Sequence, residues 1–233
     1  MDEKLRVQRL GVIGDIHAQD VRLAATIDAF SRLGVDHIAA VGDIADGRGN
    51  LARCCSLLGE AKATVVRGNH DRWLLENALR DLPHAQRLDD LDDETLGFVR
   101  ALPETAILHS AIGPVLVCHG LGSDDMDRLD PEDHYGISQN PTLPRLRASG
   151  VALVVRGHTH RRWAFNFDGL RVVNAGTLET EAGFIVVDFL EDRIHSFALP
   201  LNDAGASTIS EEWDKPLHAL HAPPSRYSRT ASR

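Results

Sequence analysis

Five short polar clusters, each directly behind an apolar run, are the feature that most constrains the fold. They read GDIH, GD, GNHD, CHG and GHTH, at residues 14–17, 42–43, 68–71, 118–120 and 157–160. The apolar runs are short and rich in β-branched residues, which is typical of buried strands. A strand that ends in glycine followed by a polar residue brings that side chain to the edge of a sheet. We therefore expect five strand ends to meet and form one polar site.

The first half of the chain alternates strands with helices. Apolar spacing predicts a helix over residues 20–33, with Asp20 as its cap and Gly34 as its stop. A second helix is predicted over residues 50–58, followed by a strand over residues 63–66. This alternation is typical of a parallel α/β sheet.

The second half is dominated by short β-type runs. They are expected at residues 105–109, 113–118, 151–156, 163–167, 170–174, 184–190 and 193–199. Asp168 and Gly169 form a hairpin signal between two of them. Two further helices are expected at residues 73–82 and 94–102. The economical architecture is two facing sheets flanked by helices, with the polar clusters at one end.

The length of the chain permits one large domain or two small ones, and no internal boundary separates two. A chain of 233 residues with 43% apolar content can bury one sizeable core. We predict a domain over residues 1–201 and a flexible tail over residues 202–233, where the Ala, Ser, Pro and Arg content rises. The N-terminus is charged, unlike a signal peptide, and no apolar stretch reaches the roughly 20 residues of a membrane span. Cys54, Cys55 and Cys118 lack the spacing of a disulfide framework or a cysteine metal site. We expect a cytoplasmic protein with no membrane partner.

The net charge of −9 argues against non-specific binding to duplex nucleic acid, which depends largely on Lys and Arg. A metal pocket can still be positive in an acidic protein, because two divalent ions outweigh two aspartates. We therefore expect a small phosphorylated substrate as the partner. The sequence gives no indication of an oligomeric state.

Together the clusters supply two strand-end carboxylates, one amide and five imidazoles, which suit a two-metal site. Asp15 and His17 project to the same side of the chain because they are alternate residues leaving a strand. Asp43 offers a carboxylate that can bridge two ions about 3.5 to 4 Å apart, and Asn69 offers a neutral oxygen. Further imidazole donors are His119, His158 and His160. No thiolate belongs to the set, so manganese, iron, zinc or cobalt are admissible and a cysteine-type zinc site is not.

The ordered set resembles the calcineurin-like metallophosphoesterase family, whose pattern is D-x-H, G-D, G-N-H-D or G-N-H-E, H and G-H-x-H. The resemblance runs from about Leu10 to Leu199. It implies an αββα sandwich of two mixed sheets with a dinuclear metal site at one end, manganese being our first choice of metal. It also implies the ligands: Asp15, His17 and His160 on one ion, Asn69, His119 and His158 on the other, and Asp43 bridging both.

The resemblance further implies catalytic roles for His70 and Asp71. His70 would act as general acid at the leaving group, and Asp71 would orient it and keep it protonated. A hydroxide bridging the two metals would attack the phosphorus. We expect metal-dependent hydrolysis of a small phosphomonoester or phosphodiester, with nucleotides among the candidates.

The loop after the second strand departs from the phosphoprotein phosphatase pattern G-D-x-V-D-R-G. The chain reads GDIADGRGN, so Arg48 is displaced by one position. Arg48 is our candidate for a substrate-binding residue that contacts a phosphate oxygen, with a solvated loop arginine as the alternative. Substrate selectivity is expected chiefly in residues 121–144, which include Arg128, His134 and Tyr135, and in the helices after Arg72.

Other functions remain open. Phosphoprotein phosphatase and dinucleoside polyphosphate hydrolase activities are alternatives within the same chemistry. A non-catalytic scaffold is a third, because the retromer subunit that resembles this fold acts mainly in assembly. A manganese-dependent nuclease would share the ligands but would need a basic groove, which the overall charge disfavours.

Overall fold

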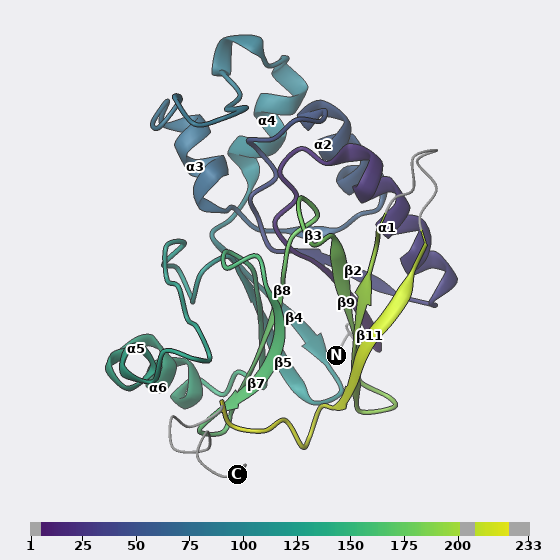
Figure 1. Ribbon diagram of the computed structural model, residues 1–233, viewed down its shortest axis with the longest axis vertical. Helices are drawn as coiled ribbons and strands as arrows, with labels where there is room; N and C mark the ends of the chain where they lie inside the picture. Colours follow the sequence, from purple (N-terminus) through teal and green to yellow (C-terminus); the bar gives the residue numbers. More distant parts are fainter. Residues whose placement is uncertain (1–5, 201–207, 224–233) are drawn as a thin grey trace, which may run out of the picture.

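Two β-sheets face each other and are covered by helices on their outer sides (Figure 1). The computed structural model describes residues 6–200 and 208–223. The six-stranded sheet has the order β11-β10-β9-β1-β2-β3, and the five-stranded sheet has the order β4-β5-β6-β8-β7. Both sheets are mixed, since each contains parallel and antiparallel pairs. The αββα sandwich expected from the resemblance is confirmed.

The elements have the following bounds. The first sheet contains β1 (Arg9–Ile13), β2 (His37–Ala40), β3 (Thr64–Val65), β9 (Gly183–Asp188), β10 (Arg193–Ala198) and β11 (Ser210–Pro216). The second contains β4 (Thr105–Ser110), β5 (Gly113–Cys118), β6 (Leu153–Arg156), β7 (Arg162–Phe167) and β8 (Leu170–Ala175). The α-helices are α1 (Asp20–Arg32), α2 (Leu51–Glu60), α3 (Asn69–Leu75), α4 (Asp93–Ala101), α5 (His134–Gln139) and α6 (Thr142–Ala148), and a 3-10 turn covers Leu88–Asp90.

Three separate apolar clusters hold the layers together. The first lies between the first sheet and helices α1, α2 and α4, where the rings of Phe30 and Phe184 meet edge to face with centroids 4.9 Å apart. The second fills the space between the sheets with small β-branched side chains such as Val12, Val117 and Val155. The third lies beneath α5 and α6 and contains Trp163. Each sheet is therefore buried on both faces, which explains why its strands are so apolar.

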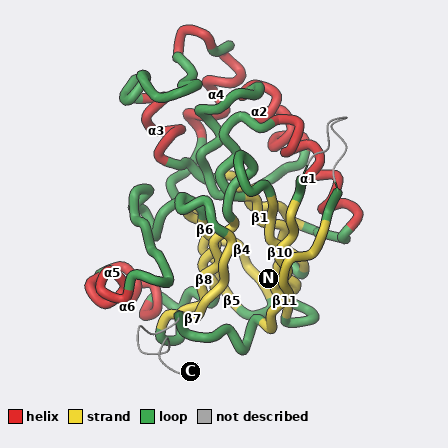
Figure 2. The backbone as a smooth tube through the Cα atoms, in the orientation of Figure 1, coloured by secondary structure: helices red, strands yellow, loops and turns green. Residues whose placement is uncertain are grey.

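The parallel strands explain why the polar clusters meet. Within the first sheet β1, β2 and β3 are parallel, and within the second β5 is parallel to β6 and β8. The chain after β1 also joins the chain after β8, because the Asp15 amide donates to the Gly176 carbonyl at 3.0 Å. Loops gather at this end of the sheets, next to α3 (Figure 2). All five clusters follow strands that end there.

Most predicted elements are present, including the hairpin at Asp168 and Gly169, whose φ angles are 52° and 95°. The predicted N-cap of α1 is wrong. Gln19 is the N-cap, and the Asp20 carboxylate accepts instead from the Asn50 amide. The helix predicted at residues 73–82 is wrong in its bounds. It begins at Asn69 and ends at Leu75, because the backbone becomes left-handed at Asn77, where φ is 52°.

The predicted tail is also corrected in part. Ser210–Pro216 form β11, which pairs antiparallel with β10 and extends the first sheet. The strand was hard to foresee because its sequence, SEEWDKP, is mostly charged and suits a solvated edge rather than a core. Residues 201–207 and 224–233 of the predicted tail lie outside the described residues. No helix in the described ranges is both long and apolar enough to cross a membrane.

Candidate metal centre

The structure brings the seven predicted metal-binding residues together in the loops at one end of the sheets. One donor atom from each of Asp15, His17 and His160 lies within 4.8 Å of the others in that group. Asp43, His119 and His158 form a second such group. The amide oxygen of Asn69 lies 2.9 Å from His119 Nε2 and so joins the second group.

Hydrogen bonds to backbone carbonyls orient two of the imidazoles. His17 Nδ1 donates to the Asp46 carbonyl at 2.9 Å, and His119 Nδ1 donates to the Val41 carbonyl at 2.8 Å. A proton on Nδ1 leaves the lone pair on Nε2 of each ring. Such a backbone bond to the far nitrogen is the usual outer support of a metal-binding histidine.

The donor atoms are crowded together, and one of them is buried without a partner. His158 Nε2 makes no hydrogen bond with the described residues, and the buried Asp15 Oδ2 lies 3.0 Å from His160 Nε2. The Nε2 atoms of His17 and His160 lie 3.2 Å apart. Buried polar atoms are rarely left unpaired, because losing a partner costs about 1–3 kcal/mol. The donor set therefore fits divalent cations, as the sequence predicts.

The backbone at the site is strained. His17, Asp43, His158 and His160 all have positive φ, between 47° and 70°. A residue with a side chain at such φ costs on the order of 1–3 kcal/mol, and such residues concentrate at functional sites. Gly42 has φ of 98°, and a Cβ there would lie 2.5 Å from the Gly68 amide nitrogen. The strand ends are packed too closely for a larger residue.

The buried ionisable side chains at the site shift one another's pKa values. Burial lowers the pKa of His119, but the Asp43 charge and a hydrogen bond to Asp43 outweigh it and raise the pKa to about 9. Burial and then the nearby His119 lower the pKa of His158 to about 4. Burial raises the pKa of Asp43, yet His119 outweighs burial and leaves the pKa well below its usual range. A cation among these groups would replace the protons that they now share.

His70 is held by Asp46, which the sequence analysis missed. His70 Nδ1 lies 2.8 Å from Asp46 Oδ2, and the same carboxylate binds both terminal nitrogens of Arg80 at 2.8 and 2.9 Å. Burial lowers the pKa of His70, but the hydrogen bond to Asp46 and the Asp43 charge raise it above its ordinary value. Asp46 could have been found from its spacing, because it is the second aspartate of the phosphatase loop pattern.

The expectation that Asp71 orients His70 is wrong. Its Oδ1 accepts from the amides of Ile44 and Ala45 at 3.0 and 2.9 Å, and its Oδ2 accepts from the Gly68 amide at 2.9 Å. Both oxygens are thus used by the backbone, and the carboxylate fastens the loop after β2 to the start of α3. Burial and the Asp43 charge raise the pKa of Asp71 to about 6.

A cavity of about 530 Å³ opens on the candidate centre. Its lining combines predicted donors with residues from α3 and from the loop after β5: Asp43, Asn69, His70, Trp73, Met126, Arg128, Asp130, His158, Thr159, His160 and Arg161. Arg128 lies in the segment in which we expected selectivity, whereas Arg161 has no sequence signal beyond following GHTH. The described lining does not include Arg48, which is exposed and donates from Nε to His84 Nε2 at 3.0 Å.

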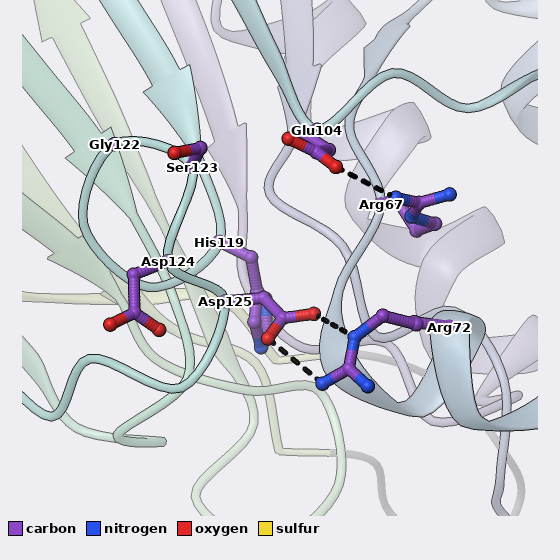
Figure 3. Close-up of a pocket in the computed structure, with 8 residues that line it drawn as sticks. All are labelled: Arg67, Arg72, Glu104, His119, Gly122, Ser123, Asp124 and Asp125. Carbon is purple, nitrogen blue, oxygen red and sulfur yellow. Dashed lines mark hydrogen bonds and ion pairs between the residues drawn. The ribbon is translucent and has the colours of Figure 1, made fainter. Parts of the chain in front are cut away.

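A second cavity of about 130 Å³ lies behind His119 (Figure 3). Two arginines point toward it and each already binds a carboxylate. Arg72 makes two hydrogen bonds to Asp125, at 2.7 and 3.0 Å, and Arg67 donates to Glu104 at 3.1 Å. The Arg72 pair fastens α3 to the loop after β5, and the Arg67 pair joins the segment before α3 to the segment before β4.

Comparisons with known proteins agree with this geometry. A family model described as the calcineurin-like phosphoesterase superfamily domain matches residues 9–191. Three solved structures have a similar fold. A metallophosphoesterase from Sphaerobacter thermophilus is 20% identical, with a TM-score of 0.59 and coverage of 90% of each chain. YfcE, a phosphoesterase from E. coli, is 17% identical, with a TM-score of 0.54 and coverage of 90% of this chain and 99% of that one. Vps29 from Chaetomium thermophilum is 14% identical, with a TM-score of 0.55 and coverage of 89% and 98%. No curated protein matches the chain in sequence.

Replacing Asp71 with Asn should lower the free energy of unfolding by about 1–3 kcal/mol, because an amide nitrogen would face backbone donors and leave at least one unpaired. Urea unfolding measures this change. The exposed Asp81, changed to Asn, is the matched control and should leave the unfolding curve unchanged. An Asp71→Asn curve that superimposes on that of the unaltered protein would contradict the structural role.

Proposed function

The chain belongs to the calcineurin-like phosphoesterase superfamily, and on this premise we propose that it hydrolyses phosphate esters with two divalent metal ions. One observation carries this proposal. Seven donors from five strand ends meet in one cluster, in which the buried His158 Nε2 has no hydrogen-bond partner among the described residues. A non-catalytic scaffold would not need such a set, with its strained backbone, beside an open cavity.

The residues would divide into two groups around Asp43. Asp15, His17 and His160 would hold one ion, and Asn69, His119 and His158 would hold the other. Asp43 suits the bridging position because a carboxylate oxygen lies within 4.8 Å of donors of His17 and His70, and a carboxylate oxygen lies within 4.8 Å of donors of His119 and His158. Two divalent ions in such a site lower the pKa of a bound water and neutralise charge on phosphoryl oxygens.

His70 would supply the proton for the leaving oxygen. Its ring lies beside His17, with centroids 4.9 Å apart, and its Nδ1 is engaged by Asp46. Nε2 is therefore the nitrogen left to face a substrate. Arg80 fixes Asp46, so the imidazole is held by a chain of two partly buried contacts. Asp46 takes the orienting role that the sequence suggested for Asp71.

The substrate and the metal are finer proposals. The superfamily includes enzymes for different esters, and we keep a small phosphomonoester or phosphodiester as the proposed substrate. Manganese remains our first choice, since carboxylate, amide and imidazole ligands all suit it. The cytoplasmic location and the avoidance of duplex nucleic acid and membranes stay predictions.

The purified protein should hydrolyse nitrophenyl phosphate or bis-nitrophenyl phosphate in the presence of Mn²⁺, and a chelator should abolish the activity. Release of nitrophenol measures the reaction, and readdition of Mn²⁺ should restore it. A folded, metal-replete sample that is inactive on aryl and alkyl monoesters and diesters would refute the proposed function.

Asp43→Asn should lose more bound metal than Asp15→Asn, because one residue would hold both ions and the other only one. Elemental analysis of the two variants makes the comparison with the same chemical change at both positions. If Asp43→Asn still retains two tightly bound metals per chain, the bridging role is wrong.

His70→Asn should retain metal but lose roughly 10²–10⁴ in kcat on alkyl phosphates, whose leaving group needs a proton. The loss on nitrophenyl esters should be smaller because nitrophenolate leaves without one. Asp46→Asn should show a weaker form of the same pattern. Equal losses on both leaving groups, or loss of metal from His70→Asn, would show instead that His70 binds phosphate or a metal.

A further inference from the structure

The cavity beside the candidate metal centre is lined by side chains that phosphoryl transfer alone does not need. Its volume of about 530 Å³ lies in the range of about 300–1,000 Å³ that small-molecule sites have. Trp73 and Met126 form an apolar part of the lining, and Arg128 and Arg161 add two cations. A substrate of one phosphate and a short alcohol would leave all four side chains unused.

Arg128 is the most informative of them. Its side chain is exposed and makes no hydrogen bond or ion pair with any residue in ranges 6–200 and 208–223. The nearest carboxylates in sequence make their hydrogen bonds within their own segment. Asp127 accepts from the Leu129 amide and from Asn140, and Asp130 accepts from the Glu132 amide.

The backbone on both sides of Arg128 is held by a buried cation. The guanidinium of Arg156, which is 0% exposed, donates to the carbonyls of Asp127 and Leu129 at 2.6 and 2.8 Å. It also donates to the Gly120 carbonyl at 2.5 Å. Arg128 is therefore presented to the cavity from a fixed segment, although its own side chain is solvated. Such preorganisation lowers the entropy cost of binding.

Arg161 is a second cation of the lining, and its side chain can turn from its present partners toward a ligand. It lies 3.8 Å from Asp130 and 3.5 Å from Glu132, and its side chain is 57% exposed. Exposed pairs at such distances contribute little. Its backbone is fixed, since its carbonyl accepts from Asn174 Nδ2 at 2.7 Å. Outside the metal donors, the described cavity lining carries two arginines against the single carboxylate of Asp130, in a chain whose net charge is −9.

Trp73 places an aromatic surface on the leaving-group side. Its ring meets that of His70 at a centroid distance of 4.8 Å and an interplanar angle of 60°. Met126, 42% exposed, adds a polarisable apolar surface to the same cavity. Aromatic side chains bind planar rings, and methionine packs well against them. The Oγ1 of Thr159, buried and unpaired within the described residues, adds one more polar atom to the lining.

Resting on the proposed function, we propose that the substrate is a nucleotide with two separate phosphate groups, of the nucleoside 3′,5′-bisphosphate class. One phosphate would lie at the metal centre, the base on Trp73 and Met126, and the other phosphate on Arg128 and Arg161. Arginine suits this role because its planar fork binds phosphate in a bidentate way. Water would add to phosphorus, the P–O ester bond would break, and the ribose oxygen would take up a proton. The products are inorganic phosphate and a nucleoside monophosphate.

The test measures binding as well as hydrolysis. Stopped-flow quenching of tryptophan fluorescence in the full chain reports binding before turnover, and the Trp73→Phe variant assigns the signal among the three tryptophans. Adenosine 3′,5′-bisphosphate should bind at least tenfold more tightly than adenosine 5′-monophosphate or 3′-monophosphate. Ribose 5-phosphate, which lacks the base, should bind more weakly than adenosine 5′-monophosphate, by roughly tenfold for one lost stacking contact.

Variants locate the second phosphate. Arg128→Ala should weaken bisphosphate binding roughly 10- to 100-fold, as expected for a lost charge-assisted hydrogen bond, and should remove most of the preference over the monophosphates. Arg128→Lys should restore part of it. Arg145→Ala, an exposed arginine of α6 outside the cavity lining, is the matched control and should leave the preference unchanged.

The outcomes separate this inference from the proposed function. Equal affinity for bisphosphate and monophosphates, or a preference that survives Arg128→Ala, would overturn the inference even if simple esters are hydrolysed. Tighter binding of a phosphopeptide would also overturn it and point to phosphoprotein substrates. Binding that depends on Arg128 with no hydrolysis of any ester would uphold the site and refute the catalytic function.

Discussion

The contacts of Asp43 connect its own segment to three of the other four segments that form the candidate metal centre. Its carbonyl accepts from the amides of Ile16 and His17, and its Oδ1 accepts from the His70 amide. Its Oδ2 lies 3.3 Å from His119 Nε2. The ends of β1 and β5 and the start of α3 are therefore positioned relative to one residue. Its left-handed φ of 48° is the local cost of turning both backbone and side chain inward.

Two other buried carboxylates, Asp46 and Asp71, hold neighbouring groups of the site in place. Asp71 binds only backbone amides and so fixes the loop after β2 to α3. Asp46 binds side chains, and through Arg80 it holds the imidazole of His70. Neither carboxylate replaces the other, because each has its oxygens fully used. The same loop thus supplies a donor toward the proposed metals at Asp43 and a support for the proposed acid at Asp46.

The second sheet contributes a cation where the first contributes carboxylates. Arg156 ends β6 one residue before the GHTH cluster and binds three carbonyls of the segment after β5. Burial lowers its pKa, yet an arginine stays charged in proteins. A buried charge with neutral partners is costly unless its hydrogen bonds are satisfied, so this segment is held firmly. The same contact that orders the fold also positions the cavity wall at Arg128.

The sequence by itself determined most of the strands, the order of the polar clusters and the edge at which Asp15, Asn69 and His158 meet. These follow from local rules: apolar periodicity sets the strands, glycine sets their ends, and parallel pairing puts those ends at one edge. Only the tertiary structure decided that Asp46 rather than Asp71 supports His70 and that Arg128 rather than Arg48 reaches the cavity. It also decided that the charged segment Ser210–Pro216 adds a strand. The physical reason is that such contacts join loops far apart in sequence, and their direction depends on left-handed turns and packing that no periodic pattern encodes.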